Sequence, residues 1–261
     1  MRQPPALITT VHDPERRLLR FFKEAGEALA AYSASYAFVT DSTHPDVIQA
    51  FRDAGVCADV GPTGVPGIGQ RRVLARAVQA GHEDMFYCDF DRWLHWAGSY
   101  PNELSSLPDR VSQDHAGAWF ICLGRTARAV ATHPLAQSLP EAATNRALST
   151  VAGKSLDATA GASWIRLAGA RLVLSGSTVT TKATDLEWPG LILRVDSAHV
   201  HGASFEGLEF ETPDSYQEEI TAVGSFEAWI RETYDRPQVQ RDRLQLAADS
   251  ITALMNVTSE P

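Results

Sequence analysis

The stretch Met85-Phe86-Tyr87-Cys88-Asp89-Phe90-Asp91-Arg92 decides how the rest of this chain is interpreted. Its first four residues predict a buried strand, and two carboxylates follow where that strand ends. Side chains two positions apart in an extended segment point the same way, so we expect Asp89 and Asp91 to face one ligand together. Two neighbouring carboxylates repel each other unless a cation lies between them, and Mg²⁺ or Mn²⁺ prefers such oxygen ligands. A solvated turn with two surface acids is the alternative, and the preceding segments bear on the choice.

The composition predicts an ordinary globular protein with an acidic surface. The chain has 261 residues, of which 44% are hydrophobic and 21% are charged, and its net charge is −9. This negative balance argues against a general nucleic-acid binder or a protein of anionic membranes. A nucleotide diphosphate is still compatible with it, because such a ligand can bind locally through a metal.

Three cysteines, Cys57, Cys88 and Cys122, show neither paired nor metal-type spacing. Such free thiols suit a reducing cytosol, so we expect a cytoplasmic protein. The first residues lack the basic, apolar and small-residue order of a signal peptide. No apolar run approaches the roughly 18 residues that span a bilayer, so no integral membrane segment is expected.

The first half of the chain alternates strands and helices. Short apolar runs predict strands over residues 6–11, 36–40, 56–60 and 85–88, and helical spacing predicts helices over 15–32, 45–54 and 70–80. This alternation predicts an α/β fold with a mostly parallel, twisted, Rossmann-type sheet and helices on both faces.

The second half is predicted to be α+β. We expect strands over residues 118–123, 194–200 and 207–211, and a helical region over 125–150 that is interrupted at Pro134 and Pro140. Residues 160–164 are interpreted as a loop before a helix that ends near 174. Further helices are expected over 213–221, 225–233 and 241–255.

The order of these motifs resembles a known family. His12 follows the first strand and Asp41 the second, then Gly67-Ile68-Gly69-Gln70-Arg71-Arg72 opens a helix that ends in Ala80-Gly81 before the acidic pair. This is similar to the nucleotide-sugar half of a GT-A-fold glycosyltransferase of the family-2-like group, over about residues 6–95. The resemblance implies a single domain over 1–261, with a nucleotide-sugar-binding half to about 98 and an acceptor-side half over about 99–261.

The same resemblance implies a metal-dependent transferase with a UDP- or GDP-sugar as donor and an acceptor that it does not identify. Asp91 would bind Mn²⁺ or Mg²⁺, and Asp89 would hold the ribose or share the metal. Thr10 and His12 would lie beside the base and ribose, and Asp41 would accept hydrogen bonds from the base. A role as helix N-cap or turn residue is the alternative for Asp41.

The Gly-rich segment is a candidate phosphate-binding element. Gly67 and Gly69 would let the backbone approach the diphosphate. Arg71 or Arg72 would contact phosphate or the acidic pair, because a planar guanidinium suits both partners. We expect one of the two arginines to be a solvated helix residue.

Thr184-Asp185-Leu186-Glu187-Trp188-Pro189 resembles the acidic turn that supplies the base in inverting members of the family. A carboxylate beside an aromatic wall can have its pKa raised toward a useful value. Asp185 is the first candidate for the base and Glu187 the second. The usual Glu-Asp pair is here Asp-x-Glu, and a helix N-cap with a first-turn acid is the alternative.

His199 and His201 are candidate third metal ligands, because the resemblance places such a ligand near a late strand end and imidazole can bind Mn²⁺. Surface histidines without a ligand are the alternative.

Three other functions share parts of this pattern. A haloacid-dehalogenase-type phosphatase also carries Asp-x-Asp after a strand, but on its first strand, whereas three predicted strands precede Asp89 here. A nucleotidyltransferase would carry a Gly-rich basic loop after the first strand, where this chain has His12-Asp13-Pro14-Glu15. A non-catalytic nucleotide-sugar-binding module would keep the fold and the cavity.

Overall fold

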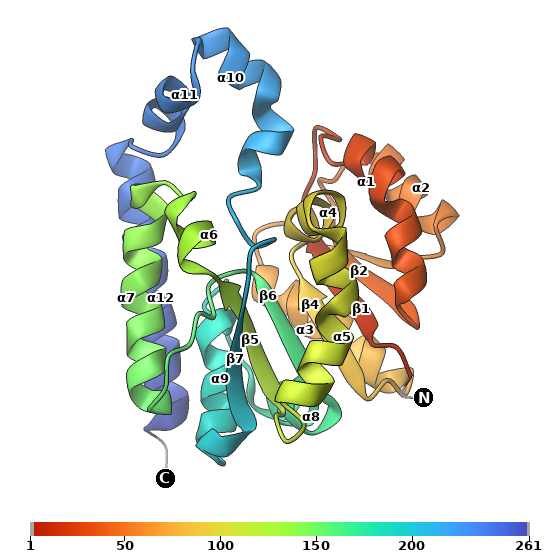
Figure 1. Ribbon diagram of the computed structural model, residues 1–261, viewed down its shortest axis with the longest axis vertical. Helices are drawn as coiled ribbons and strands as arrows, with labels where there is room; N and C mark the ends of the chain where they lie inside the picture. The colour runs from red at the N-terminus through yellow and green to blue at the C-terminus, as the bar shows by residue number, and fades with distance from the viewer. Residues whose placement is uncertain (1–2, 260–261) are drawn as a thin grey trace.

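The computed structural model describes residues 3–259, which form one seven-stranded sheet in the order β3-β2-β1-β4-β6-β5-β7 (Figure 1). The strands are β1 (Ala6–Val11), β2 (Ala34–Thr40), β3 (Cys57–Gly61), β4 (Asp84–Cys88), β5 (Phe120–Arg125), β6 (Ala162–Arg166) and β7 (Val200–Phe205). Strands β1 to β4 are parallel, β6 is antiparallel to its neighbours β4 and β5, and β7 is parallel to β5. The predicted mostly parallel α/β sheet is confirmed.

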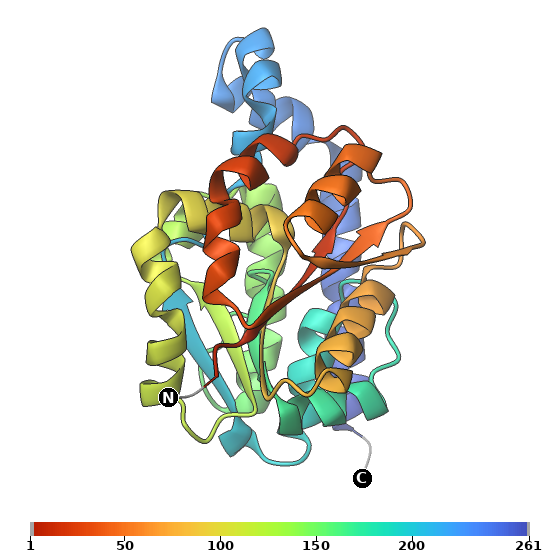
Figure 2. The same cartoon turned by 90° about the vertical axis from the view of Figure 1, so that its right-hand side faces the viewer.

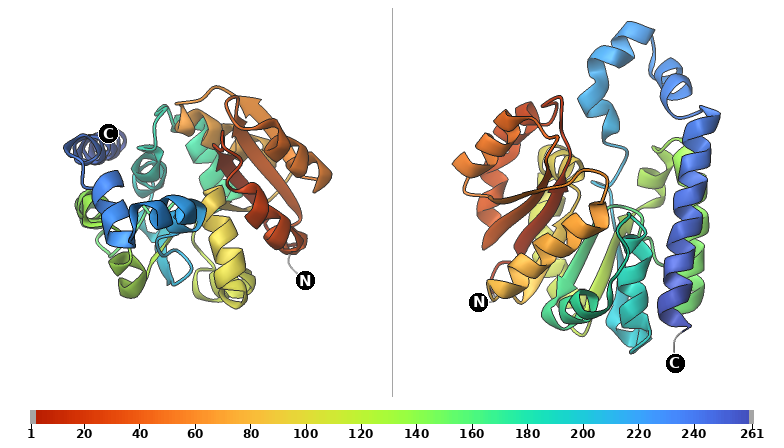
Figure 3. Two further views of the ribbon diagram at one scale, coloured as in Figure 1. Left: turned by 90° about the horizontal axis from the view of Figure 1, so that it is seen from above. Right: turned by 180° about the vertical axis from the view of Figure 1, so that it is seen from behind.

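The helices cover both faces of this sheet (Figure 2). They are α1 (Leu19–Ala25), α2 (Pro45–Asp53), α3 (Pro66–Gln79), α4 (Phe90–Ser99), α5 (Pro101–Asp114), α6 (Ala127–Ala131), α7 (Leu135–Ala152), α8 (Leu167–Gly176), α9 (Thr184–Leu193), α10 (Gln217–Val223), α11 (Phe226–Thr233) and α12 (Pro237–Thr258). Short 3₁₀ helices are η1 (Gly26–Ala31), η2 (Ser197–His199) and η3 (Thr212–Tyr216). Helices α1, α2, α4 and α5 pack on one face, and α3, α8 and α9 pack on the other, with α7 and α12 side by side next to α9 (Figure 3).

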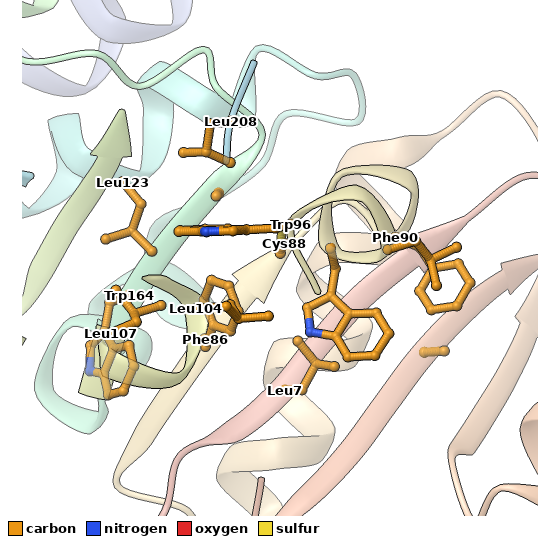
Figure 4. Close-up of a cluster of buried hydrophobic side chains, with 14 of the residues drawn as sticks. Leu7, Phe86, Cys88, Phe90, Trp96, Leu104, Leu107, Leu123, Trp164 and Leu208 are labelled. Atoms are coloured by element: carbon orange, nitrogen blue, oxygen red, sulfur yellow. The ribbon is translucent and has the colours of Figure 1, made fainter. Parts of the chain in front are cut away.

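A buried aromatic cluster fixes α4 against the sheet (Figure 4). Phe90, Trp93 and Leu94 recur at helical spacing and are all buried. The ring of Trp96 lies 6.0 Å from that of Phe86 on β4 and 5.1 Å from that of Phe205 on β7. Burying side chains of this size contributes about 1.5–3 kcal/mol each. The cluster therefore holds the N-terminal end of α4, which carries the acidic pair, in a fixed place.

Several predictions for the second half were wrong in detail. Residues 207–211 form no strand, and β7 begins at Val200, where the strand predicted over 194–200 was expected to end. Strand β6 lies across the end of the predicted loop and the start of the helix predicted after it, and it is buried on both faces and so lacks the alternation of a half-exposed strand. Pro140 lies inside α7 instead of interrupting it. In the first half, only residues 19–25 of the helix predicted over 15–32 are α-helical.

Helices α10 and α11 extend from one end of the molecule (Figure 1). Trp229 of α11 packs with Phe210 and Tyr234, which flank these helices in the chain, in a small apolar cluster separate from the two cores on the sheet. Arg17 connects this arm to the first half of the chain, because its guanidinium lies 2.5 Å from Glu219 and over the ring of Tyr216. Across residues 3–259, every helix is too short or too polar to cross a membrane.

Candidate functional site

The chemically reactive side chains gather beyond the carboxyl ends of the parallel strands. Asp89 follows β4, Asp41 follows β2, and Thr10 is the second-last residue of β1. The carboxyl ends of parallel strands meet at one edge, which is where open α/β sheets bind their ligands. Asp41 and Asp89 therefore lie at the same edge of the sheet.

The acidic pair has a different local structure from the predicted one. Strand β4 ends at Cys88, Asp89 is the N-cap of α4, and Asp91 lies in the first turn of that helix. The extended geometry expected for both residues was therefore wrong. They are nevertheless brought together, because both line the same two cavities at the sheet edge.

Asp89 is buried, and each of its two carboxylate oxygens accepts a hydrogen bond. One carboxylate oxygen accepts a hydrogen bond from the Tyr87 hydroxyl at 2.6 Å, and the other accepts one from Nζ of Lys182 at 2.7 Å. Gln70 and Thr10 in turn hydrogen-bond to the Tyr87 hydroxyl. Burial alone would raise the pKa of Asp89, but the charge and the hydrogen bond of Lys182 lower it below its ordinary value. Asp89 is therefore an ionised carboxylate paired with a lysine.

Asp91 is exposed at the cavity wall and, unlike Asp89, accepts no hydrogen bond from another side chain within the described residues. Its carboxylate accepts a hydrogen bond from the backbone N–H of Arg92 at 2.9 Å. Desolvation of the carboxyl group in the recess, followed by the charge of Asp89, raises the pKa of Asp91. This wall thus carries negative charge that a bound cation would neutralise.

Lys182 is held in place by a braced loop, residues 177–182. The buried carboxylate of Glu187 accepts hydrogen bonds from the backbone N–H groups of Thr178 and Val179 at 2.7 and 3.1 Å. From the other side, the N–H of Gly67 donates to the carbonyl of Thr180 at 2.9 Å. The loop that presents Lys182 is therefore fixed by residues from both α3 and α9.

Asp185 lies in the first turn of α9 and is half-buried. Burial raises its pKa to about 7, and the negative charges of Asp89 and Glu141 act in the same direction, whereas Lys182 and Arg92 act against it. A carboxyl group with a pKa near neutrality can accept a proton and remain deprotonated for much of the time, as a general base requires.

Two cavities meet at this group of residues. The first, which we call the sheet-side cavity, has a volume of about 480 Å³ and lies between the ends of β1 and β2 and the loop of residues 62–66. The second, the helix-side cavity, has a volume of about 200 Å³ and is bounded by α7, α9 and α12. Both are lined by Asp89, Asp91 and Lys182, and Asp185 lines only the helix-side cavity of the two.

The helix-side cavity is lined by paired charges and hydroxyl groups. Its buried Arg92 forms an ion pair with Glu211 at 3.0 Å. Thr144 on α7 and Ser250 on α12 also line it. The base candidate Asp185 faces this polar recess, which suits a small hydroxylated ligand.

Among the other predicted residues, Thr10 and His12 line the sheet-side cavity. Asp41 is near this cavity but is not among its lining residues. Its carboxylate accepts hydrogen bonds from the hydroxyl and the N–H of Thr63 at 2.7 and 3.2 Å and so braces the loop that does line it.

The Gly-rich segment serves packing in this structure. A β-carbon on Gly67 would lie 2.6 Å from the carbonyl of Val179, and one on Gly69 would lie 2.4 Å from the ring of Phe38. Arg71 donates to the hydroxyl of Ser177, and Arg72 pairs with Asp59 at 2.6 Å. None of these four predicted phosphate-binding residues lines either cavity.

Three predicted site residues lie away from the cavities. Glu187 is 1% exposed and uses its carboxylate within the loop of residues 177–182. His199 stacks on Trp119 with ring centroids 3.7 Å apart, and His201 hydrogen-bonds to the carbonyl of Ala198. His199 ends η2 and His201 is the second residue of β7, which runs in the same direction as β4 and so starts at the edge opposite to Asp89. The structure thus does not bring them to the acidic pair.

Lys182, Arg92 and Glu211 are site residues that the sequence reasoning missed. The lysine precedes Asp185 by three positions in a Thr-rich segment that shows neither strand nor helix periodicity. Its partner Asp89 lies 93 positions earlier, so only the fold brings the two charges together.

The site provides oxygen ligands that fit a divalent cation. Within residues 3–259, no three His, Cys, Asp or Glu side chains are grouped to hold a metal by themselves. Mg²⁺, however, is commonly bound by one or two carboxylates together with substrate phosphates and water. Asp91, with its raised pKa and exposed carboxylate, and Asp89 meet this description.

Comparisons with known proteins show the fold. No family model and no curated protein sequence matches the chain. Solved structures of glucosyl-3-phosphoglycerate synthase from Mycobacterium tuberculosis are similar over 99% of this chain and 81% of theirs. The structure with phosphoglyceric acid has a TM-score of 0.60 at 11% identity, and that with Mn²⁺, UDP-glucose and phosphoglyceric acid has 0.58 at 12%. The predicted GT-A fold is confirmed.

Proposed function

We propose that this protein is a metal-dependent glycosyltransferase that moves a sugar from a nucleotide diphosphate to a hydroxyl group of a small acceptor. The observation that carries the proposal is the junction of two cavities at Asp89, Asp91 and Lys182, with Asp185 on the far side of that junction. Such an arrangement lets two ligands meet, with cation-binding groups beside one and a candidate base beside the other.

The sheet-side cavity is the proposed site of the sugar donor. Its volume of about 480 Å³ falls in the range of small-molecule sites. Asp89 and Asp91 would hold Mn²⁺ or Mg²⁺, which would supply positive charge to the diphosphate leaving group. The similar structures contain UDP-glucose and Mn²⁺, which supports a UDP-sugar over a GDP-sugar.

The helix-side cavity is the proposed site of the acceptor. Asp185 would accept the proton of the acceptor hydroxyl while that oxygen forms a bond to the anomeric carbon. The bond from this carbon to the diphosphate breaks at the same time, and its electron pair leaves with the diphosphate. A single displacement of this kind inverts the anomeric configuration.

The decisive experiment measures binding of UDP and GDP by calorimetry with and without Mn²⁺, followed by a screen of UDP-sugars. We expect UDP to bind in Mn²⁺ and to lose most of its affinity without the metal or in Asp91→Asn. Asp53→Asn is the matched control, because Asp53 is exposed on α2 and hydrogen-bonds to Gln49. Metal-independent UDP binding, or full binding by Asp91→Asn, would refute the metal role.

Two of the alternative functions give different results in the same assays. A non-catalytic module would bind UDP in Mn²⁺ and transfer or hydrolyse no sugar. A haloacid-dehalogenase-type phosphatase would hydrolyse p-nitrophenyl phosphate through an aspartyl-phosphate on Asp89. We expect no such turnover, because Asp89 is already paired with Lys182 and follows the fourth strand of a GT-A fold.

A further inference from the structure

We propose that Lys182 is the residue that contacts the diphosphate of the sugar donor, and that it exchanges its partner when ligands bind. In the ligand-free protein it neutralises Asp89, and it releases this carboxylate to a divalent cation and turns to the diphosphate. The proposal rests on the proposed function and extends it to a residue that neither the sequence motifs nor the fold comparisons indicate.

The charges of the sheet-side cavity require such a residue. Its wall carries the two carboxylates of Asp89 and Asp91, which repel a diphosphate. Among the residues that line this cavity in the described part of the chain, Lys182 is the only lysine or arginine. The arginines predicted for phosphate binding, Arg71 and Arg72, are directed to Ser177 and Asp59. Within the described residues, this cavity therefore offers one cationic side chain, the ammonium group of Lys182, to the diphosphate.

The position of Lys182 is fixed by contacts of its loop with neighbouring elements. Its loop is held by Glu187, by Arg71 and by the N–H of Gly67, and it delivers Nζ to 2.7 Å from Asp89. A solvated surface lysine needs no such support. The side chain is nevertheless 45% exposed and lines both cavities, so the ammonium group remains within reach of a ligand.

An exchange follows from the charges and the crowding at the carboxylate of Asp89. The Tyr87 hydroxyl occupies one carboxylate oxygen, and Lys182 occupies the other. A divalent cation bound to Asp89 would lie close to the ammonium group of Lys182 and repel its positive charge. The flexible four-carbon stem of lysine lets the ammonium move to a nearby phosphate oxygen. A fixed ion pair that only neutralises Asp89 is the alternative.

The test measures Mn²⁺ binding alone and UDP binding in saturating Mn²⁺ for wild type and Lys182→Met. Loss of the competing ammonium should tighten Mn²⁺ binding about tenfold, and loss of the phosphate contact should weaken UDP binding about tenfold or more, the scale of one charge-assisted hydrogen bond. Lys182→Arg should keep UDP binding within a few-fold of wild type. Lys23→Met removes an exposed lysine of α1 and should change neither affinity.

Unchanged Mn²⁺ and UDP affinities in Lys182→Met would overturn the proposal in favour of the fixed ion pair. A variant that fails to fold is replaced by amine labelling of Lys182 in the wild type, read by mass spectrometry. Mn²⁺ alone should increase the labelling and subsequent UDP should decrease it, and constant labelling would also overturn the exchange. The Mn²⁺ steps need no nucleotide, so they distinguish failure of this inference from a wrong choice of sugar donor.

Discussion

Gly161 lies so close to Asp89 that no other residue fits without displacing the carboxylate. A β-carbon on Gly161 would lie 2.8 Å from Oδ2 of Asp89, the oxygen that Lys182 contacts. The carbonyl of Gly161 also accepts a hydrogen bond from the Asp89 N–H at 2.9 Å. Gly161 therefore positions Asp89 in two ways. Its carbonyl binds the Asp89 N–H, and its lack of a β-carbon leaves room for the Asp89 carboxylate.

Gly161→Ala should abolish Mn²⁺-dependent UDP binding and lower stability by about 1–3 kcal/mol, because it combines a collision with a left-handed backbone of φ +69°. Gly153→Ala is the matched control, with φ +66° and no atom within 4 Å of the new β-carbon. It should lower stability by about 1 kcal/mol and leave UDP binding intact. Calorimetry and thermal denaturation measure both effects, and equal loss of binding in the two variants would contradict the expected role of Gly161.

Asp185→Asn should lower turnover by about a hundredfold or more, the scale of a lost general base, and leave UDP binding nearly unchanged. In the wild type, turnover should rise with pH as Asp185 deprotonates near its pKa of about 7, and a bound cation should shift this rise to lower pH. The pH–rate profile of wild type and variant tests both points. Glu187→Gln is the companion variant, because Glu187 lies in the same turn but braces residues 177–182. Unchanged turnover in Asp185→Asn would contradict its role as general base, whatever the result for Glu187→Gln.

Asp185 should also make the protein less stable as the pH rises. Its folded-state pKa of about 7 lies above the value near 3.9 of an unfolded aspartate. Between these values the folded state binds more protons than the unfolded state, so the free energy of unfolding falls as pH increases. Asp185→Asn should therefore raise the melting temperature more at pH 8 than at pH 4.

Thermal denaturation across this pH range measures the difference. Asp109→Asn is the control, because Asp109 is exposed on α5 and lies outside both cavities. It should show no comparable dependence on pH. An equal gain for Asp185→Asn at both pH values would contradict the raised pKa.

Gly69→Ala and Gly98→Ala should change stability in opposite directions. Both glycines are helical, but a β-carbon on Gly69 would lie 2.4 Å from the ring of Phe38, whereas one on Gly98 would meet no atom within 4 Å. We expect Gly69→Ala to destabilise the protein by about 1–3 kcal/mol. Gly98→Ala should stabilise it by about 0.5–1 kcal/mol, because alanine loses less backbone entropy in a helix. Chemical denaturation measures both values, and a neutral Gly69→Ala would show that Phe38 moves freely.

The parts of the fold that the sequence predicts well are those with local signals. Strands β1 to β4 are short apolar runs followed by turn residues, and each was located to within about two residues. Strand β6 was missed because it is buried on both faces and directly follows the turn at Gly161. Strand β7 was expected too early, which moved His199 and His201 from the start of a strand to a predicted strand end.

The site was only partly predictable for the same reason. Asp89, Asp91 and Asp185 belong to compact acidic motifs, and these three line the cavities. Residues two apart in a helix do not share a face, so Asp185 and Glu187 of one motif have separate environments. No local sequence pattern marks Lys182, because its role depends on the carboxylate of Asp89, which only the folded chain places beside it.

The position of β6 has a consequence for any attempt to divide this protein. Strand β4, which ends at the acidic pair, is hydrogen-bonded on one side to β1 and on the other to β6, a strand that follows it by more than seventy positions. A fragment that ends near residue 98 would expose the backbone of an entirely buried strand as a sheet edge. Such edges recruit other chains, so the first 98 residues on their own should aggregate rather than fold as an independent unit.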